Sequence, residues 1–403
     1  MTSPGPSLDE INRARTLLEG ISVVTPMEGA RWLSKAAGGL VLLKAENLQR
    51  AGSFKIRGAY TRMARLSDEQ RANGVVAASA GNHAQGVALA AQLLGIKAVV
   101  FMPVGANIAK EKATRGYGAD VRFHGTSFDE ALLEAKKYAE ETGAVLVHPF
   151  DHADIVAGQG TCGLEILEQC PDVRTILVPT GGGGLLAGIS AAVKAQRPDV
   201  TVVGVQAEGA AAYPPSLAAG QPEMLAEMAT MADGIAVGRP GDVPFATIAA
   251  LVDEIVTVNE ESISQALLML IERAKLVVEP AGATAVAAMM DRPDRFETPA
   301  VAVLSGGNID PILLMNVLRH GMATTGRYLS FRVRIPDRPG GLARLLADLA
   351  QANANVLDVV HQRTGAYLHI GEVEVALQVE TRGAPHAAEV LRRLRDNGYP
   401  VSE

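Results

Sequence analysis

Apolar residues along most of the chain come in short runs, rich in Val, Ala and Ile, that alternate with longer segments of helical periodicity. The runs predict strands at 39–44, 74–78, 98–102, 120–123, 145–147, 175–178, 202–206, 255–258 and 300–304. The longer segments predict helices from Ile56 and at 87–94, 108–117, 129–142, 163–169, 185–196, 261–275 and 281–290. Strands and helices that alternate at this spacing predict a parallel, doubly wound α/β sheet. Residues 208–244 break the pattern and are predicted to form connecting or lid-like structure.

The pattern changes after Arg319. Phe331, Val333 and Ile335 alternate with arginines, as in a strand with one buried face. Further strands at 356–361 and 373–379, amphipathic helices from Gly341 and at 387–395, and a last strand near Tyr399 give the order βαββαβ. This predicts a second domain, residues 328–403, after a first domain that ends at about residue 325.

Composition excludes several classes of protein. A chain of 403 residues is longer than a single core usually extends, and 48% apolar with 20% charged residues is typical of a well-buried globular protein. The net charge of −7, without runs of Lys or Arg, argues against nucleic-acid binding. No apolar stretch has the length of a membrane span, and Cys162 and Cys170 are too far apart on one helix to pair. We therefore expect a soluble, cytoplasmic protein without membrane contact.

Lys55 is the first chemical candidate. It follows a Gly-Ser turn and Phe54 between a predicted strand and a predicted helix, where an α/β unit presents a side chain to a cleft. A lysine amine that loses water there can lose its proton and act as a nucleophile or form a Schiff base. An ordinary loop lysine is the alternative, because most lysines are exposed.

Four successive glycines, Gly181, Gly182, Gly183 and Gly184, lie between a strand and the start of a helix. Backbone N–H groups and the helix dipole bind phosphate at such places, and a Cβ would block the approach. A flexible turn is one alternative. A dinucleotide site is another, because Gly182, Gly184 and Ala187 fit the Rossmann spacing and Glu208 ends the next strand. A single phosphate is the simpler ligand, since a dinucleotide leaves Lys55 unexplained.

Two further polar loops follow strands, where open α/β sheets bind ligands. In the loop from Ser79, Asn82 could bond a planar ligand, and the N–H groups at the start of the helix could hold a carboxylate. His83 is also explained by a bond to the backbone at a helix N-terminus. The third loop, Ser305 to Asn308, offers a hydroxyl as a neutral partner for a ring nitrogen.

Five motifs together resemble one known family. They are Ser-Phe-Lys-Ile-Arg-Gly-Ala at 53–59, Ser-Ala-Gly-Asn-His-Ala-Gln-Gly at 79–86, Ile-Val-Ala-Gly-Gln-Gly-Thr at 155–161, the glycine run, and Ser-Gly-Gly-Asn-Ile-Asp at 305–310. The chain from about residue 13 to 319 resembles threonine ammonia-lyase (threonine dehydratase), a pyridoxal-phosphate enzyme of the fold type II, tryptophan-synthase-β-like group. The resemblance implies a catalytic domain of two α/β lobes, the smaller (about 56–152) inserted in the larger. The C-terminal βαββαβ unit resembles an ACT regulatory domain.

The resemblance also implies residue roles. Lys55 would form the Schiff base with pyridoxal 5'-phosphate and act as the base on Cα. Phe54 would pack near the cofactor ring, Asn82 would bond its 3-hydroxyl, and Ser305 its pyridine nitrogen. The cofactor phosphate would lie on Gly181, Gly182, Gly183, Gly184 and Leu185, and the substrate carboxylate on the loop of Ser79, Ala80, Gly81, Asn82 and His83. A serine at the ring nitrogen gives a weaker electron sink and favours elimination over transamination.

Three positions sharpen the comparison. Ala80 stands where the similar serine racemases carry a second base, a serine, so racemisation is not expected. No carboxylate follows Glu208 at the position of the racemase divalent-metal site, so we expect no metal other than a monovalent cation that Glu208 could bind. Glu279 lies in a family motif at the cleft, and a buried structural hydrogen bond explains it equally well.

The predicted function is deamination of L-threonine to 2-oxobutanoate and ammonia, with L-serine to pyruvate as a secondary reaction. A 3-hydroxyaspartate ammonia-lyase, a serine ammonia-lyase and a non-catalytic amino-acid sensor are the alternatives. The ACT-like domain is expected to bind an amino-acid effector, although dimerisation alone would also explain it. The expected assembly is a homodimer or homotetramer.

Overall fold

The computed structural model describes residues 5–106, 108–363 and 368–402, and it divides into two compact units, Met1–Pro311 and Ile312–Glu403. Helix α14 (Pro311–Thr324) is therefore counted with the second unit, whereas the sequence predicts it in the first. A helix that connects two units can be assigned to either, so the predicted limits 1–325 and 328–403 stay a prediction. No helix among the described residues is long and apolar enough to cross a membrane.

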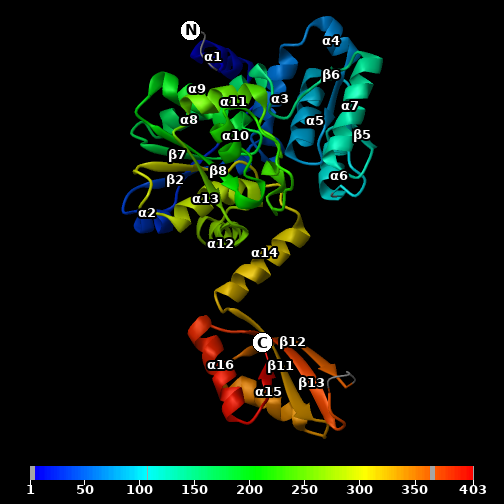
Figure 1. Ribbon diagram of the computed structural model, residues 1–403, viewed down its shortest axis with the longest axis vertical. Helices are drawn as coiled ribbons and strands as arrows, with labels where there is room; N and C mark the ends of the chain where they lie inside the picture. The colour runs from blue at the N-terminus through cyan, green and yellow to red at the C-terminus, as the bar shows by residue number, and fades with distance from the viewer. Residues whose placement is uncertain (1–4, 107, 364–367, 403) are drawn as a thin grey trace. The chain divides into compact units, whose positions relative to one another are not determined.

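The first unit contains two lobes, each built on its own sheet (Figure 1). The larger lobe has six strands in the order β1-β2-β10-β7-β8-β9, parallel except for the β1–β2 pair. The strands are β1 (Met27–Gly29), β2 (Val41–Lys44), β7 (Thr175–Pro179), β8 (Thr201–Ala207), β9 (Glu254–Val258) and β10 (Ala300–Val303). The central strands β7, β8 and β10 are almost wholly buried, which explains their continuous runs of Val, Ile and Ala.

Helices pack around this larger sheet. They are α1 (Leu8–Leu17), α2 (Arg31–Ala37), α8 (Ala153–Gln169), α9 (Gly184–Gln196), α10 (Tyr213–Ala219), α11 (Asp242–Leu251), α12 (Glu260–Met269) and α13 (Pro280–Asp291). Short helical turns lie at η1 (Glu46–Leu48), η2 (Arg50–Gly52), η3 (Glu208–Ala210), η4 (Asp233–Ile235) and η5 (Leu270–Ala274). Helix α8 begins ten residues before the predicted start at Gly163, so Cys162 lies within it and Cys170 at its C-cap, both buried and unpaired.

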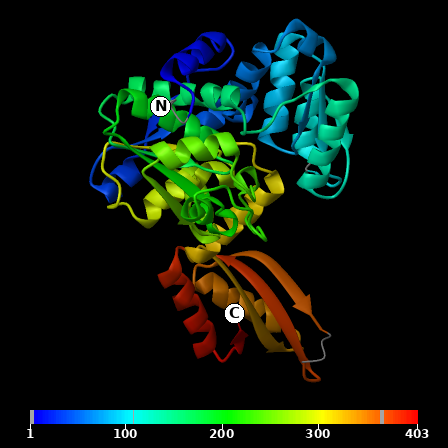
Figure 2. The same cartoon turned by 45° about the horizontal axis from the view of Figure 1, so that its top comes forward.

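The smaller lobe has four parallel strands in the order β5-β4-β3-β6 (blue to cyan in Figures 1 and 2). They are β3 (Val75–Ala78), β4 (Ala98–Met102), β5 (Asp120–Phe123) and β6 (Val145–Leu146), and the helices beside them are α3 (Lys55–Ala64), α4 (Asp68–Asn73), α5 (Asn82–Leu94), α6 (Ile108–Gly116) and α7 (Phe128–Thr142). Strands β4 and β5 have the predicted limits, and the other strands of the lobe agree within one residue at each end.

The second unit contains, besides α14, an antiparallel sheet in the order β12-β13-β11-β14 and two further helices among its described residues. These further elements are β11 (Tyr328–Pro336), α15 (Gly341–Gln351), β12 (Asn355–Gln362), β13 (Glu372–Glu380), α16 (Ala384–Asp396) and β14 (Val401–Ser402). Phe331, Val333 and Ile335 lie in its core, while the arginines between them are more exposed. The predicted βαββαβ order and the alternation of β11 are confirmed.

Candidate active site

The turn before Lys55 lies against the loop that follows β10. Ser53 forms an antiparallel bridge with Gly306, and the Phe54 N–H donates a hydrogen bond to the Ser305 carbonyl at 3.2 Å. Gly52 has a φ of +70°, and a Cβ there would collide with the side chain of Asn308, so only glycine fits this turn. The Ser53–Lys55 stretch and the Ser305 loop, far apart in sequence, therefore form one structural unit.

Lys55 is the first residue of α3 and is half-buried. Its Nζ donates to the Pro149 carbonyl at 3.0 Å and lies 5.1 Å from the centre of the Phe54 ring. No carboxylate among the described residues is within ion-pair distance of this nitrogen. Burial lowers the pKa of Lys55 to about 8, although the charge of Glu279 raises it. Such an amine is neutral in a substantial fraction of molecules near physiological pH and can react as a nucleophile.

Helix α5 brings the Asn82 loop close to Lys55. A Cβ at Gly86 would lie 3.1 Å from the Cβ of Lys55, so the absence of a side chain lets the two helices approach. Asn82 donates from Nδ2 to Glu279 Oε1, and its Oδ1 accepts from Asn308 Nδ2 at 2.8 Å. The side-chain amide of Asn82 is thereby held at both ends.

The rest of the predicted substrate loop is only partly free. The Ser79 hydroxyl accepts from the Gly81 N–H at 3.1 Å, so this N–H already has a partner, and Ala80 lies half-buried between them. His83 is buried, and its Nε2 bonds the Val147 carbonyl at 2.7 Å. Burial, followed by the charge of Lys55, lowers the pKa of His83 to about 3, so the ring is neutral and Nε2–H is the donor. The structure thus shows the backbone-bonded histidine that the sequence left as an alternative.

The glycine run ends β7 and leads into α9, with Gly183 as the N-cap at a φ of +98°. Each glycine has a close protein neighbour. A Cβ at Gly181 would lie 2.9 Å from Ile235 Cα, and a Cβ at Gly183 would collide with the Tyr213 side chain. A Cβ at Gly182 would lie 2.5 Å from the Phe150 ring, and a Cβ at Gly184 would lie 3.0 Å from Phe150 Cβ. The sequence offered a bound ligand or a flexible turn as the reason for these glycines, and in the structure protein neighbours also require them. The first N–H groups of α9, including that of Leu185, have no acceptor within the helix, so this end suits an anion.

The segment from His148 to Phe150 was not predicted. Pro149 accepts the Lys55 bond and Phe150 packs on the glycine run, so this segment connects the two sites. His148 Nδ1 accepts from the Asp151 N–H at 2.9 Å, and burial lowers the pKa of His148 to about 4. The segment follows the carboxyl end of strand β6, as the other candidate loops follow the ends of their strands. This position after a predicted strand could have marked the segment as a site candidate in the sequence.

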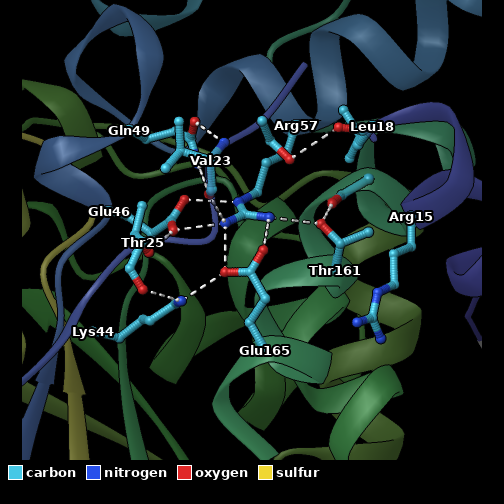
Figure 3. Close-up of polar contacts among 12 residues, drawn as sticks. Arg15, Leu18, Val23, Thr25, Lys44, Glu46, Gln49, Arg57, Thr161 and Glu165 are labelled. Carbon is cyan, nitrogen blue, oxygen red and sulfur yellow. Dashed lines mark hydrogen bonds and ion pairs between the residues drawn. The ribbon is translucent and has the colours of Figure 1, made fainter. Parts of the chain in front are cut away.

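A second cluster lies two residues beyond Lys55 (Figure 3). Arg57 is fully buried and bonds Glu46 through Nε at 2.8 Å and Glu165 through Nη1 at 2.7 Å. Lys44 Nζ also bonds Glu165 at 2.6 Å, and Arg57 Nη1 donates to the Thr161 hydroxyl at 3.1 Å. Burial disfavours the charged forms of both Glu46 and Arg57, but their ion pair outweighs this effect. The pKa of Glu46 is therefore below its usual value, and the pKa of Arg57 is above its usual value. The cluster ties α3 to η1, β2 and α8.

Glu208 lies elsewhere. It is exposed in η3 and lines a groove of about 630 Å³ along the edge strand β9, together with Arg292 and Arg295. In the described part of the chain no group of three or more His, Cys, Asp or Glu side chains could hold a metal ion. A monovalent cation at Glu208 stays a prediction.

Comparison with known proteins identifies the family. Residues 19–306 match the family of pyridoxal-phosphate dependent enzymes, and residues 330–396 match the ACT domain. An L-threonine ammonia-lyase of Thermotoga maritima is 46% identical over 98% of both chains. The chain belongs to the threonine ammonia-lyase family of pyridoxal-phosphate dependent enzymes. A second relative in this family, from Geobacter sulfurreducens, is 47% identical over 91% of this chain and 92% of its own. Maize serine racemase has a similar fold, with a TM-score of 0.74 and 34% identity over 79% of this chain and 99% of its own.

The cofactor of this threonine ammonia-lyase family member is pyridoxal phosphate, and the site fits it. Lys55 offers a half-buried amine with a lowered pKa, and the α9 N-terminus offers unpaired N–H groups. The Ser53 hydroxyl, two residues before Lys55, is buried without a hydrogen-bond partner among the described residues. Phe54 packs against the apolar cluster that includes Leu185.

Proposed function

We propose that the protein deaminates L-threonine to 2-oxobutanoate and ammonia. The observation that carries the proposal is Lys55, an amine with no carboxylate partner in the described part of the chain. It lies where the Ser305 loop, helix α5 and the His148–Phe150 segment meet. Both curated relatives described above are L-threonine ammonia-lyases and are similar to this chain over nine tenths or more of its length.

Several residues would hold the cofactor. Lys55 would bind it covalently, Phe54 would pack beside its ring, and Asn82 and Ser305 would contact its polar ring atoms. Its phosphate would lie on the N–H groups of the glycine run and Leu185. When bound, pyridoxal phosphate supplies the electron sink that acidifies the Cα–H bond of an amino acid.

Groups of the chain itself would bind the substrate carboxylate and take the proton from its Cα atom. The first turn of α5, with Ser79 and the N–H groups of Asn82 and His83, would hold the substrate carboxylate. Lys55 would take the Cα proton, and the β-hydroxyl of threonine would leave with one proton as water, so that the two groups lost from the substrate together make up one water molecule. The released enamine tautomerises to an imine, and water hydrolyses it to 2-oxobutanoate and ammonia. The same path gives pyruvate from L-serine.

Ala80 favours elimination over racemisation. Its methyl group cannot deliver a proton to Cα from the face opposite Lys55. The likeness to maize serine racemase therefore concerns the fold, and we propose that racemisation is a minor reaction at most.

The ACT domain is the proposed site of regulation. An amino-acid effector would bind there and change activity by its differential affinity for two states of a homodimer or homotetramer. Activity in the presence of each branched-chain amino acid, compared with that of a chain truncated after Arg327, tests this part separately.

The main proposal is tested by mixing the holoenzyme with L-threonine and following 2-oxobutanoate. We expect product with threonine, less with serine, and little with 3-hydroxyaspartate. A holoenzyme that shows the absorbance of lysine-bound cofactor but forms no keto acid would contradict the proposal. In that case the amino-acid sensor becomes the better explanation.

A further inference from the structure

Glu279 is a buried carboxylate, bonded to Asn82, that the proposed reaction does not use. It is 2% exposed and precedes α13, and its N–H donates to the Gly306 carbonyl at 3.0 Å. Its Oε1 accepts from Asn82 Nδ2. A Cβ at Gly306 would lie 3.0 Å from Asn82 Nδ2 and collide with the carboxylate, so the loop after β10 is shaped around this bond.

The bond fixes which way Asn82 points. Its Oδ1 accepts from Asn308 Nδ2, which also donates to the Ala51 carbonyl at 2.8 Å just before the Lys55 turn. If the Asn82 amide were reversed, its oxygen would face the Glu279 carboxylate, and two acceptors repel each other. Glu279 therefore sets the orientation of an amide that is connected to the Lys55 turn through Asn308.

We propose that Glu279 is a positioning residue for the reaction at Lys55, whose ionised carboxylate holds the Asn82 amide and acts by its charge on the Lys55 site. The proposal rests on the proposed function in one respect, because Asn82 is taken there as a cofactor ligand. It differs from a merely structural hydrogen bond in requiring the charge as well as the shape of the side chain.

The charges around Glu279 come from both lobes. Burial, followed by the charge of Asp233 in η4, raises the pKa of Glu279 to about 7, against the opposing effects of Lys110 in α6, the Asn82 bond and Lys55 in α3. Lys110 Nζ also donates to Asp233 Oδ2 at 2.6 Å. The ionised form is therefore present above about pH 7 and is lost as the pH falls through this value.

The decisive variant is Glu279→Gln, which keeps the shape and an acceptor for Asn82 but removes the charge. We measure the pH dependence of the holoenzyme's cofactor absorbance, which needs no substrate, and of kcat and KM with L-threonine. Wild-type protein should show a transition near pH 7 in both profiles, and Glu279→Gln should show none. We also expect kcat to fall about tenfold or more with a smaller change in KM, since misplaced catalytic groups typically have effects of this size.

Two variants of the Lys110–Asp233 pair test the charge without changing Glu279 itself. Asp233→Asn should move the transition to lower pH and Lys110→Met to higher pH, each by about half to one unit. Neither should have an effect on the profile in the Glu279→Gln background. If a thermal melt shows that Glu279→Gln does not fold, the opposite shifts expected for Asp233→Asn and Lys110→Met still test the role of the Glu279 charge.

The outcomes separate this proposal from the proposed function. Profiles of Glu279→Gln that superimpose on those of the wild type, or shifts in the same direction for Asp233→Asn and Lys110→Met, would overturn the role of Glu279. A wild type without 2-oxobutanoate would overturn threonine deamination, while the absorbance profiles would still test Glu279.

Discussion

Lys55 and Arg57 lie two residues apart on α3, yet their surroundings differ in nearly every respect. Arg57 is fully buried and makes ion pairs with both Glu46 and Glu165, and Lys44 completes the charge balance (Figure 3). Among the described residues, Lys55 donates to a backbone carbonyl and has no carboxylate within ion-pair distance, although the charge of Glu279 raises its pKa. One helix thus carries two cations, Arg57 in a closed ionic cluster and Lys55 beside the Ser305 loop and the His148–Phe150 segment.

The difference shows how the fold separates stability from reactivity. Burial with carboxylate partners holds the Arg57 charge in place, whereas burial without one lowers the pKa of Lys55 to about 8. The helix that carries both is fixed to α8, because a Cβ at Gly158 would lie 2.5 Å from the Arg57 carbonyl. The cluster therefore serves to hold the end of α3 from which Lys55 projects.

The largest effect is expected from Lys55→Met. It should lower kcat for 2-oxobutanoate formation by about 10⁴-fold or more, because it removes the group that holds the cofactor and takes the proton. The free energy of unfolding of the cofactor-free chain at pH 7 should not fall. The pKa of Lys55 is lower in the folded chain, so the folded state binds this proton less tightly and is penalised below about pH 8.

Urea unfolding at pH 7 and pH 10 checks that sign. The variant should be at least as stable as the wild type at pH 7, and the difference should shrink as the pH rises through 8 towards the ordinary pKa of lysine. A clear loss of stability at pH 7 would show that Lys55 belongs with Arg57 as a structural cation.

Arg57→Met should have the opposite result. It leaves Glu46 and Glu165 buried with Lys44 as the remaining cation, and a broken buried ion pair typically costs about 3–5 kcal/mol. Urea unfolding measures this loss, and kcat of the folded fraction should change far less than in Lys55→Met. Arg57→Lys is the matched control: it keeps the charge but cannot bond both carboxylates in the same forked geometry, so an intermediate loss is expected.

Much of the fold could be predicted from local patterns. Strand β4 is a continuous, buried apolar run, and this is why it was predicted at its observed limits. Strand β5 is a mostly exposed edge strand, and its limits were predicted from the alternation of strands and helices. Helix α1 was missed although Ser7 and Glu10 form a capping box, because the polar segment before it hid the signal. The first half of α8 was missed because its small residues, Gly158 among them, show no apolar periodicity.

The site was predictable in part. Strand ends and glycines placed Lys55, Asn82, the glycine run and Ser305 as candidates, and the structure brings them together. The pairing of Arg57 with Glu165 could not be read from the sequence, because the two residues are 108 positions apart and meet only when α3 crosses α8. The bond between Asn82 and Glu279 was hidden for the same reason.

The smallest effect concerns an ion pair on the same helix as Glu165. Glu168 lies three residues later on α8 and pairs with Arg15 of α1, with side-chain exposures of 52% and 46%. Exposed pairs contribute little because water and salt screen them, so a double-mutant cycle with Arg15→Ala and Glu168→Ala should give a coupling of about 0.5 kcal/mol or less. The same cycle on Arg57 and Glu165 should give several times more and respond less to added salt. Equal couplings would mean that burial does not distinguish the two pairs, and the contrast between the ionic cluster and the protein surface would fail.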